Sequence, residues 1–202
     1  MNKSDKLIFG LFLSVVFLVL FSLLAGTIGF YVNKGNNMPY FVASGFLTGV
    51  LADILFLRKL INKLFDLPVW LLAGLYILGN VFIYGMFMGF PLFNLLMGIV
   101  AGYYYGRMIS VKNIVSPQRD KLIRNVSLFT MLIMVFICIS SAFLGLREKT
   151  IGEELQGMFG LNFIPSRGLI VSGTVIGGSA LIIAQYFLTR IVLVKTLKAN
   201  SE

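Results

Sequence analysis

The sequence predicts an all-α polytopic membrane protein: a six-transmembrane-helix bundle over residues 1–202, a single domain with both termini cytoplasmic. Three observations carry this prediction. The chain is 58% hydrophobic and only 12% charged, its apolar residues form six long runs, and its Lys and Arg lie between those runs. A soluble domain has roughly 25% charged residues and avoids large apolar areas in water. We therefore expect a lipid bilayer around the chain and no nucleic acid, despite a net charge of +9.

Six segments are long enough to cross the roughly 30 Å hydrocarbon layer, which takes about 20 mainly apolar residues. They cover approximately residues 7–32, 40–57, 69–88, 92–109, 122–144 and 169–193. Pro39, Pro68 and Pro91 stand at or just before the first turn of three segments, where a missing N–H costs nothing. The first run exceeds the apolar core of a cleaved signal peptide, so we expect it to be retained.

The distribution of basic residues predicts the orientation. Most of the 17 Lys and Arg fall on one side of the six segments, and basic loops stay in the cytoplasm. This places both termini inside and predicts a multi-pass protein of the plasma membrane.

The last external connection predicts a short helix over residues 151–159. Thr150 and Glu153 have capping-box spacing, an apolar stripe follows, and Gly160 is placed to end the helix. Such a helix would lie along the outer membrane surface. It is either a strut or a lid over an outward-facing pocket.

Small residues recur at four-residue spacing, which allows membrane helices to approach closely. The pairs and triplets are Gly45 and Gly49 in the second segment, Gly98, Gly102 and Gly106 in the fourth, and Gly173 and Gly177 in the sixth. In the fourth and sixth segments we expect packing inside the bundle. Gly10 and Ser14, on the first segment, could instead dock another membrane protein.

Asp53 is an ionisable residue in an apolar run, about 20 Å along the helix from Tyr40. At this depth, near the cytoplasmic interface, a charge can reach water or a cationic partner. We expect an ion pair with Arg107 that holds the second segment to the fourth. The alternative is a proton or cation site.

A second set of polar residues predicts a solute site in the outer half of the membrane. Its members are Asn80, Tyr84, Asn94, Asn162 and Arg167. Binding pockets are mostly apolar with a few placed polar groups, as this set would provide. The alternative is that the amides only form hydrogen bonds between helices.

Several kinds of chemistry have no support in the sequence. The chain contains no His, the commonest general base and transition-metal ligand. It has no metal-ligand spacing, phosphate-binding glycine loop or nucleophile elbow. We therefore expect no enzymatic activity, no cofactor and no metal site.

The run GFLTGVLAD, from Gly45 to Asp53, and the six-span topology resemble the S-components of energy-coupling-factor transporters, the substrate-capturing subunits of that family. The resemblance implies binding of a small solute from outside. It also implies two partners, a transmembrane coupling subunit and cytoplasmic ATPases, with Gly10 and Ser14 as the docking point. The first external loop is shorter than the capping loop typical of that family. The alternative function is a structural or accessory membrane protein that binds another through glycine-rich helix faces.

Overall fold

The computed structural model describes residues 3–33, 37–87 and 89–199, and these contain helices and turns but no strand. The chain divides into two compact units, Met1–Leu71 and Leu72–Glu202. We refer to them as unit 1 and unit 2 and describe each by itself. The all-helical fold is confirmed, and the single six-helix domain stays a prediction.

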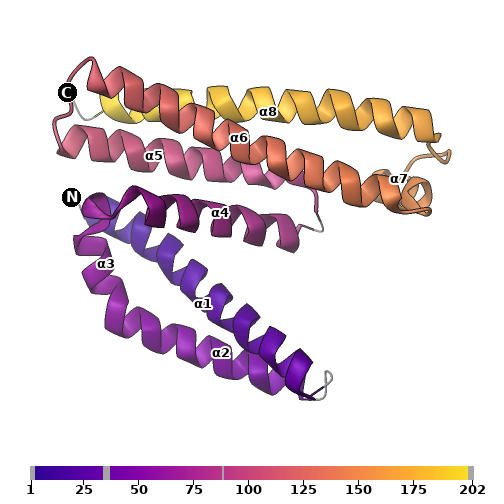
Figure 1. Ribbon diagram of the computed structural model, residues 1–202, viewed down its shortest axis with the longest axis horizontal. Coiled ribbons are helices and arrows are strands. Elements are labelled where there is room, and N and C mark those ends of the chain that lie inside the picture. The colour runs from indigo at the N-terminus through magenta and orange to yellow at the C-terminus, as the bar shows by residue number, and fades with distance from the viewer. Residues whose placement is uncertain (1–2, 34–36, 88, 200–202) are drawn as a thin grey trace. The chain divides into compact units, whose positions relative to one another are not determined.

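Unit 1 is built around two helices that pack side by side, α1 and α2 (Figure 1). Its elements are α1 (Lys3–Asn33), α2 (Met38–Ala52), the π-helical turn η1 (Asp53–Leu57), α3 (Arg58–Asn62) and the 3-10 turn η2 (Leu64–Asp66). The contact depends on glycine. A Cβ at Gly45 would lie 2.8 Å from Ser22 Cα, and one at Gly49 would lie 2.9 Å from Leu18 Cα.

The second predicted segment is longer than the sequence suggested. It begins after Asn37, whose φ of 63° is left-handed, with Pro39 in the first turn. From Asp53 the helix continues through η1 into α3 and ends at Asn62, beyond the predicted end near residue 57.

Unit 2 contains most of α4 and all later helices. Its elements are α4 (Val69–Met86), η3 (Pro91–Asn94), α5 (Leu95–Val111), α6 (Gln118–Arg147), α7 (Ile151–Phe159) and α8 (Arg167–Lys198). The predicted end of the third segment, residue 88, lies outside the described residues. Helix α8 packs along both α5 and α6 (Figure 1).

The glycines of α5 form the contact with α8, which confirms the predicted internal packing of the fourth segment. A Cβ at Gly102 would lie 2.7 Å from Thr189 O, and one at Gly106 would lie 2.7 Å from Thr196 Cβ. Beyond this seam Ile109, Val126 and Leu193 form an apolar cluster that joins α5, α6 and α8.

In the sixth segment Gly173 and Gly177 take no part in the packing, whereas a Cβ at Gly178 would lie 3.8 Å from Cys138 Cβ on α6. No described atom lies within 4 Å of a Cβ built at Gly173 or Gly177. Most buried residues of α8 lie in its second half, namely Gln185, Thr189 and Leu193, and Ile170 is buried in its first turn. Glycine spacing shows that a close approach is possible, but it does not show which face of a helix meets a neighbour.

The short helix over residues 151–159 is present as α7. Gly160, with a φ of 60°, ends it as expected. The predicted capping box between Thr150 and Glu153 does not form. Thr150 Oγ1 donates to Glu154 Oε1 at 3.0 Å, so its hydroxyl caps no backbone N–H.

Five of the helical segments are long and apolar enough to cross a membrane: Asp5–Val32, Met38–Asn62, Val69–Met86, Gln118–Arg147 and Arg167–Lys198. Large apolar side chains are exposed along them; Leu11 is 62% exposed and Ile176 is 71% exposed. Such surfaces are compatible with a membrane protein. The fourth predicted segment is divided between the 3-10 turn η3 and α5, which has 17 residues.

Candidate functional site

Three buried amide side chains lie inside unit 2, each on a different element. Asn80 belongs to α4, Asn94 ends η3, and Gln185 belongs to α8. Their exposed fractions are 2%, 0% and 1%. Because polar groups are seldom buried without hydrogen bonds, their partners indicate what this region does.

The amides form a hydrogen-bonded chain with Tyr76. Asn94 Nδ2 donates to Asn80 O at 2.8 Å and to Asn80 Oδ1 at 3.1 Å. Asn80 Nδ2 donates to the Tyr76 carbonyl, one turn earlier, at 2.9 Å. Gln185 Nε2 donates to the Tyr76 hydroxyl at 3.0 Å. We call Tyr76, Asn80, Asn94 and Gln185 the amide cluster.

Two acceptors in the amide cluster have no donor. Asn94 Oδ1 and Gln185 Oε1 are shielded from solvent and make no hydrogen bond to any described residue. Turning the Asn94 amide over would set its oxygen against two Asn80 oxygens, so its orientation is fixed by its partners. An unpaired buried acceptor costs roughly 1–3 kcal/mol. Each of the two oxygens could therefore accept a hydrogen bond from a small donor such as water.

Gly98 on α5 makes room for the amide cluster. A Cβ at this position would lie 2.7 Å from Gln185 Nε2 and 2.8 Å from Thr189 Oγ1. Thr189 is one turn beyond Gln185 and is fully buried. Its hydroxyl is 3.1 Å from Thr130 Oγ1 on α6, so this pair extends the polar contacts to a fourth helix.

Of the predicted solute-site residues, the structure brings only Asn80 and Asn94 together. Tyr84, Asn162 and Arg167 lie elsewhere. Tyr84 lies outside the amide cluster and packs at the α4–α5 turn, where its hydroxyl would be 3.2 Å from a Cβ at Gly89. That glycine has a φ of 78°, a conformation that favours glycine. Ser141 Oγ donates to Gly89 O at 2.8 Å and ties the turn to α6.

Asn162 and Arg167 are exposed near the start of α8. Arg167 Nη2 donates to Leu146 O at 3.4 Å, and neither residue hydrogen-bonds to Asn80 or Asn94. The prediction also left out Tyr76 and Gln185. Gln185 could have been found because it is an isolated amide in the apolar second half of the sixth segment.

Asp53 has a partner that the sequence reasoning did not assign to it. Ser14 Oγ on α1 donates to Asp53 Oδ2, while Asp53 Oδ1 is shielded and has no partner among the described residues. Arg107 is buried on α5 in unit 2. Because the expected ion pair would join two units that are described separately, it stays a prediction.

The proposed docking residues on α1 contact their own unit. A Cβ at Gly10 would lie 3.2 Å from Ile61 Cδ1 on α3, and Ser14 donates to Asp53. This face is therefore occupied by packing within unit 1. Docking of a partner subunit at Gly10 and Ser14 stays a prediction.

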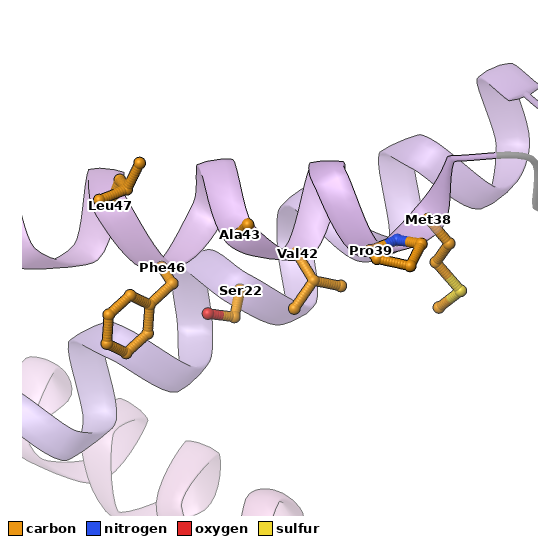
Figure 2. A pocket seen from close by; sticks show the side chains of 7 residues that line it. All are labelled: Ser22, Met38, Pro39, Val42, Ala43, Phe46 and Leu47. Carbon is orange, nitrogen blue, oxygen red and sulfur yellow. The ribbon is translucent and has the colours of Figure 1, made fainter.

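Unit 1 also has an open hollow of about 780 Å³ between α1 and α2 (Figure 2). It is lined by Ser22 of α1 and by Met38, Pro39, Val42, Ala43, Phe46 and Leu47 of α2. The Ser22 hydroxyl donates to Leu18 O at 2.7 Å, within its own helix. The lining is otherwise apolar, so the hollow suits hydrocarbon and not a polar solute.

The described residues contain no group of three or more His, Cys, Asp and Glu side chains that could hold a metal ion. No protein family, curated protein or solved structure matches the chain.

Proposed function

We propose that this chain is an integral membrane protein that crosses the bilayer six times and binds a small polar solute within unit 2. In this proposal α5, extended by η3, crosses the membrane in addition to the five long apolar helices. Both termini are cytoplasmic. The charge distribution supports the orientation, because basic connections stay inside. The α4–α5 turn would then face outward, in a plasma membrane.

The observation that carries the proposal is the pair of unpaired acceptors, Asn94 Oδ1 and Gln185 Oε1. Both belong to side chains that are almost fully buried and held in place by Tyr76 and Asn80. A rigid site with free acceptors discriminates strongly for ligands that donate hydrogen bonds. Because amides carry no charge, the solute would be neutral and would present N–H or O–H groups.

The resemblance to S-components of energy-coupling-factor transporters supports a role as a substrate-binding subunit. In that role the chain would catalyse no reaction. The energy for transport would come from cytoplasmic ATPases through a transmembrane coupling subunit. Affinity purification from native membranes tests these partners directly.

Solute binding itself is tested by thermal unfolding of the purified protein with neutral amides, nucleobases and vitamins. A ligand that binds only the folded state raises the melting temperature by mass action. Gln185→Met keeps the approximate size of the side chain and removes Oε1, so the ligand-induced shift should be lost. Thr130→Val, in the same unit but outside the amide cluster, should retain it. Solutes that stabilise Gln185→Met and the wild type equally would contradict the site.

A second function, an accessory membrane protein, is favoured by the open glycine face of α8. Gly173 and Gly177 could admit a helix of another protein at close range, since a Cβ at either position would have no described atom within 4 Å apart from the neighbouring backbone of α8. This function predicts that Gly173→Leu abolishes a co-purifying membrane partner. It also predicts that no solute changes the melting temperature.

A further inference from the structure

Asp53 interrupts an apolar helix that is long enough to cross the membrane, Met38–Asn62. It is also the first residue of the π-helical turn η1. Its own N–H donates to Gly49 O and Val50 O, as in an α-helix, and the π-helical turn follows from Asp53 to Leu57. Single π-helical turns within α-helices are rare and frequently mark functional positions.

The Asp53 carboxylate accepts fewer hydrogen bonds than it could. An ionised carboxylate can accept about four hydrogen bonds. Asp53 accepts one at Oδ2, from Ser14 Oγ on α1, and its Oδ1 has no partner although it is shielded from solvent. Asp53 and Ser14 together contribute three oxygen atoms from two helices. Of these, Asp53 Oδ1 has no partner among the described residues.

Among the described residues of unit 1, the charged groups nearest to this carboxylate along the chain lie on α1 and α3. On α1, Asp5 and Lys6 precede Ser14 by eight or nine residues, a rise of about 12 Å. On α3, Arg58 and Lys59 are exposed, and the helical rise from Asp53 to Arg58 is about 8 Å. Among the described residues, no Lys or Arg of unit 1 pairs with Asp53.

We propose that Asp53 and Ser14 form a binding site for a monovalent metal cation such as Na⁺. A carboxylate that no described cation of unit 1 pairs with is costly in an apolar span, and a bound cation of charge +1, in place of the predicted Arg107, would cancel its charge. Carboxylate and hydroxyl oxygens are hard ligands, which hard cations prefer. A divalent ion would leave an excess positive charge at the same depth. This site lies wholly in unit 1 and does not depend on solute binding in unit 2.

The first test compares thermal unfolding of the full chain in NaCl, KCl and N-methylglucamine chloride at equal ionic strength. Na⁺ or K⁺ should raise the wild-type melting temperature by about 3 °C relative to the bulky cation. Asp53→Asn, which is nearly isosteric, should lose this shift. Ser14→Ala should raise the half-saturating cation concentration about tenfold. Ser22→Ala is the matched control, because that hydroxyl bonds its own helix, and it should behave as wild type.

The second test uses only the wild-type protein, so it does not depend on how a variant folds. Dicyclohexylcarbodiimide adds to a protonated carboxyl group and rearranges to a stable N-acylurea, which mass spectrometry locates. Na⁺ should slow the modification of Asp53, and N-methylglucamine should not. Equal melting temperatures in all three salts, or modification of Asp53 at the same rate with and without Na⁺, would overturn the proposal.

Discussion

The two units use the same glycine spacing for partly different purposes. In unit 1, Gly45 and Gly49 bring α2 against backbone atoms of α1. In unit 2, Gly98 opens space for the side chains of Gln185 and Thr189, which then bond to α4 and α6. Glycine therefore brings two backbones together in both units, through Gly45 and Gly49 in unit 1 and Gly102 in unit 2, and in unit 2 Gly98 also makes room for polar side chains. The following predictions test this difference, from the largest expected effect to the smallest.

Gly45→Val should have the largest effect. Its Cβ would lie 2.8 Å from Ser22 Cα and 2.7 Å from Ala25 Cβ, so α1 and α2 must separate. We expect a loss of about 3 kcal/mol in the free energy of unfolding, measured by denaturation followed by circular dichroism. Gly177→Val is the control, since nothing described lies within 4 Å of that position. Equal losses in the two variants would contradict the packing of unit 1.

Along α5, Gly102→Ala should cost more than Gly98→Ala. The methyl group at residue 102 meets backbone, Thr189 O at 2.7 Å, whereas at residue 98 it meets side-chain ends, which can shift at the cost of a hydrogen bond. We expect about 2 kcal/mol for Gly102→Ala and about half as much for Gly98→Ala. The reverse order would show that the polar side chains are held more rigidly than the backbone contact.

Asn94→Ala should destabilise the amide cluster by about 2 kcal/mol, because Asn80 Oδ1 loses its donor in a buried site. Gln185→Met loses only the single hydrogen bond to the Tyr76 hydroxyl and keeps the approximate volume of the side chain, so its cost should be below about 1 kcal/mol. Parallel denaturation curves of the two variants measure the difference. A larger cost for Gln185→Met would show that Gln185 Oε1 already has a partner in the free protein.

The smallest effect should come from the Thr130–Thr189 hydrogen bond. A double-mutant cycle with Thr130→Val and Thr189→Val should give a coupling free energy of about 0.6 kcal/mol, typical of hydrogen bonds between membrane helices. Thr48→Val is the control, because the Thr48 hydroxyl donates to Ser44 O within its own helix. It should therefore show no coupling to Thr189→Val.

The helices could be predicted from the sequence because each long apolar run encodes its own element. Pro39 and Gly160 also mark helix ends that depend on local backbone geometry alone. The amide cluster was found only in part. Asn80 and Asn94 are close in sequence and share one hairpin, whereas Gln185 reaches Tyr76 across 109 residues. Such a contact depends on which face of α8 packs inward, and the apolar pattern of a membrane helix does not define that face.

The exposed loop residues show the opposite failure. Asn162 and Arg167 are polar and lie in or next to the last external connection, so their expected depth, close to that of Asn80 and Asn94, suggested a shared pocket. In the structure Arg167 is engaged with Leu146 O at the end of α6. A long side chain next to a helix C-terminus is drawn to the unpaired carbonyls there. Arg167 therefore donates to Leu146 O and forms no hydrogen bond with Asn80 or Asn94.

The most direct test of the account is whether α5 crosses the membrane, because the outward position of the α4–α5 turn depends on it. In a Cys138→Ala background, single cysteines at Phe90, Gln118 and Asn162 would be treated with an impermeant maleimide on intact cells. We predict labelling of Phe90→Cys and Asn162→Cys from outside, and of Gln118→Cys only after permeabilisation. Labelling of Phe90→Cys and Gln118→Cys from the same side would contradict a sixth crossing and the proposed outward access to the amide cluster.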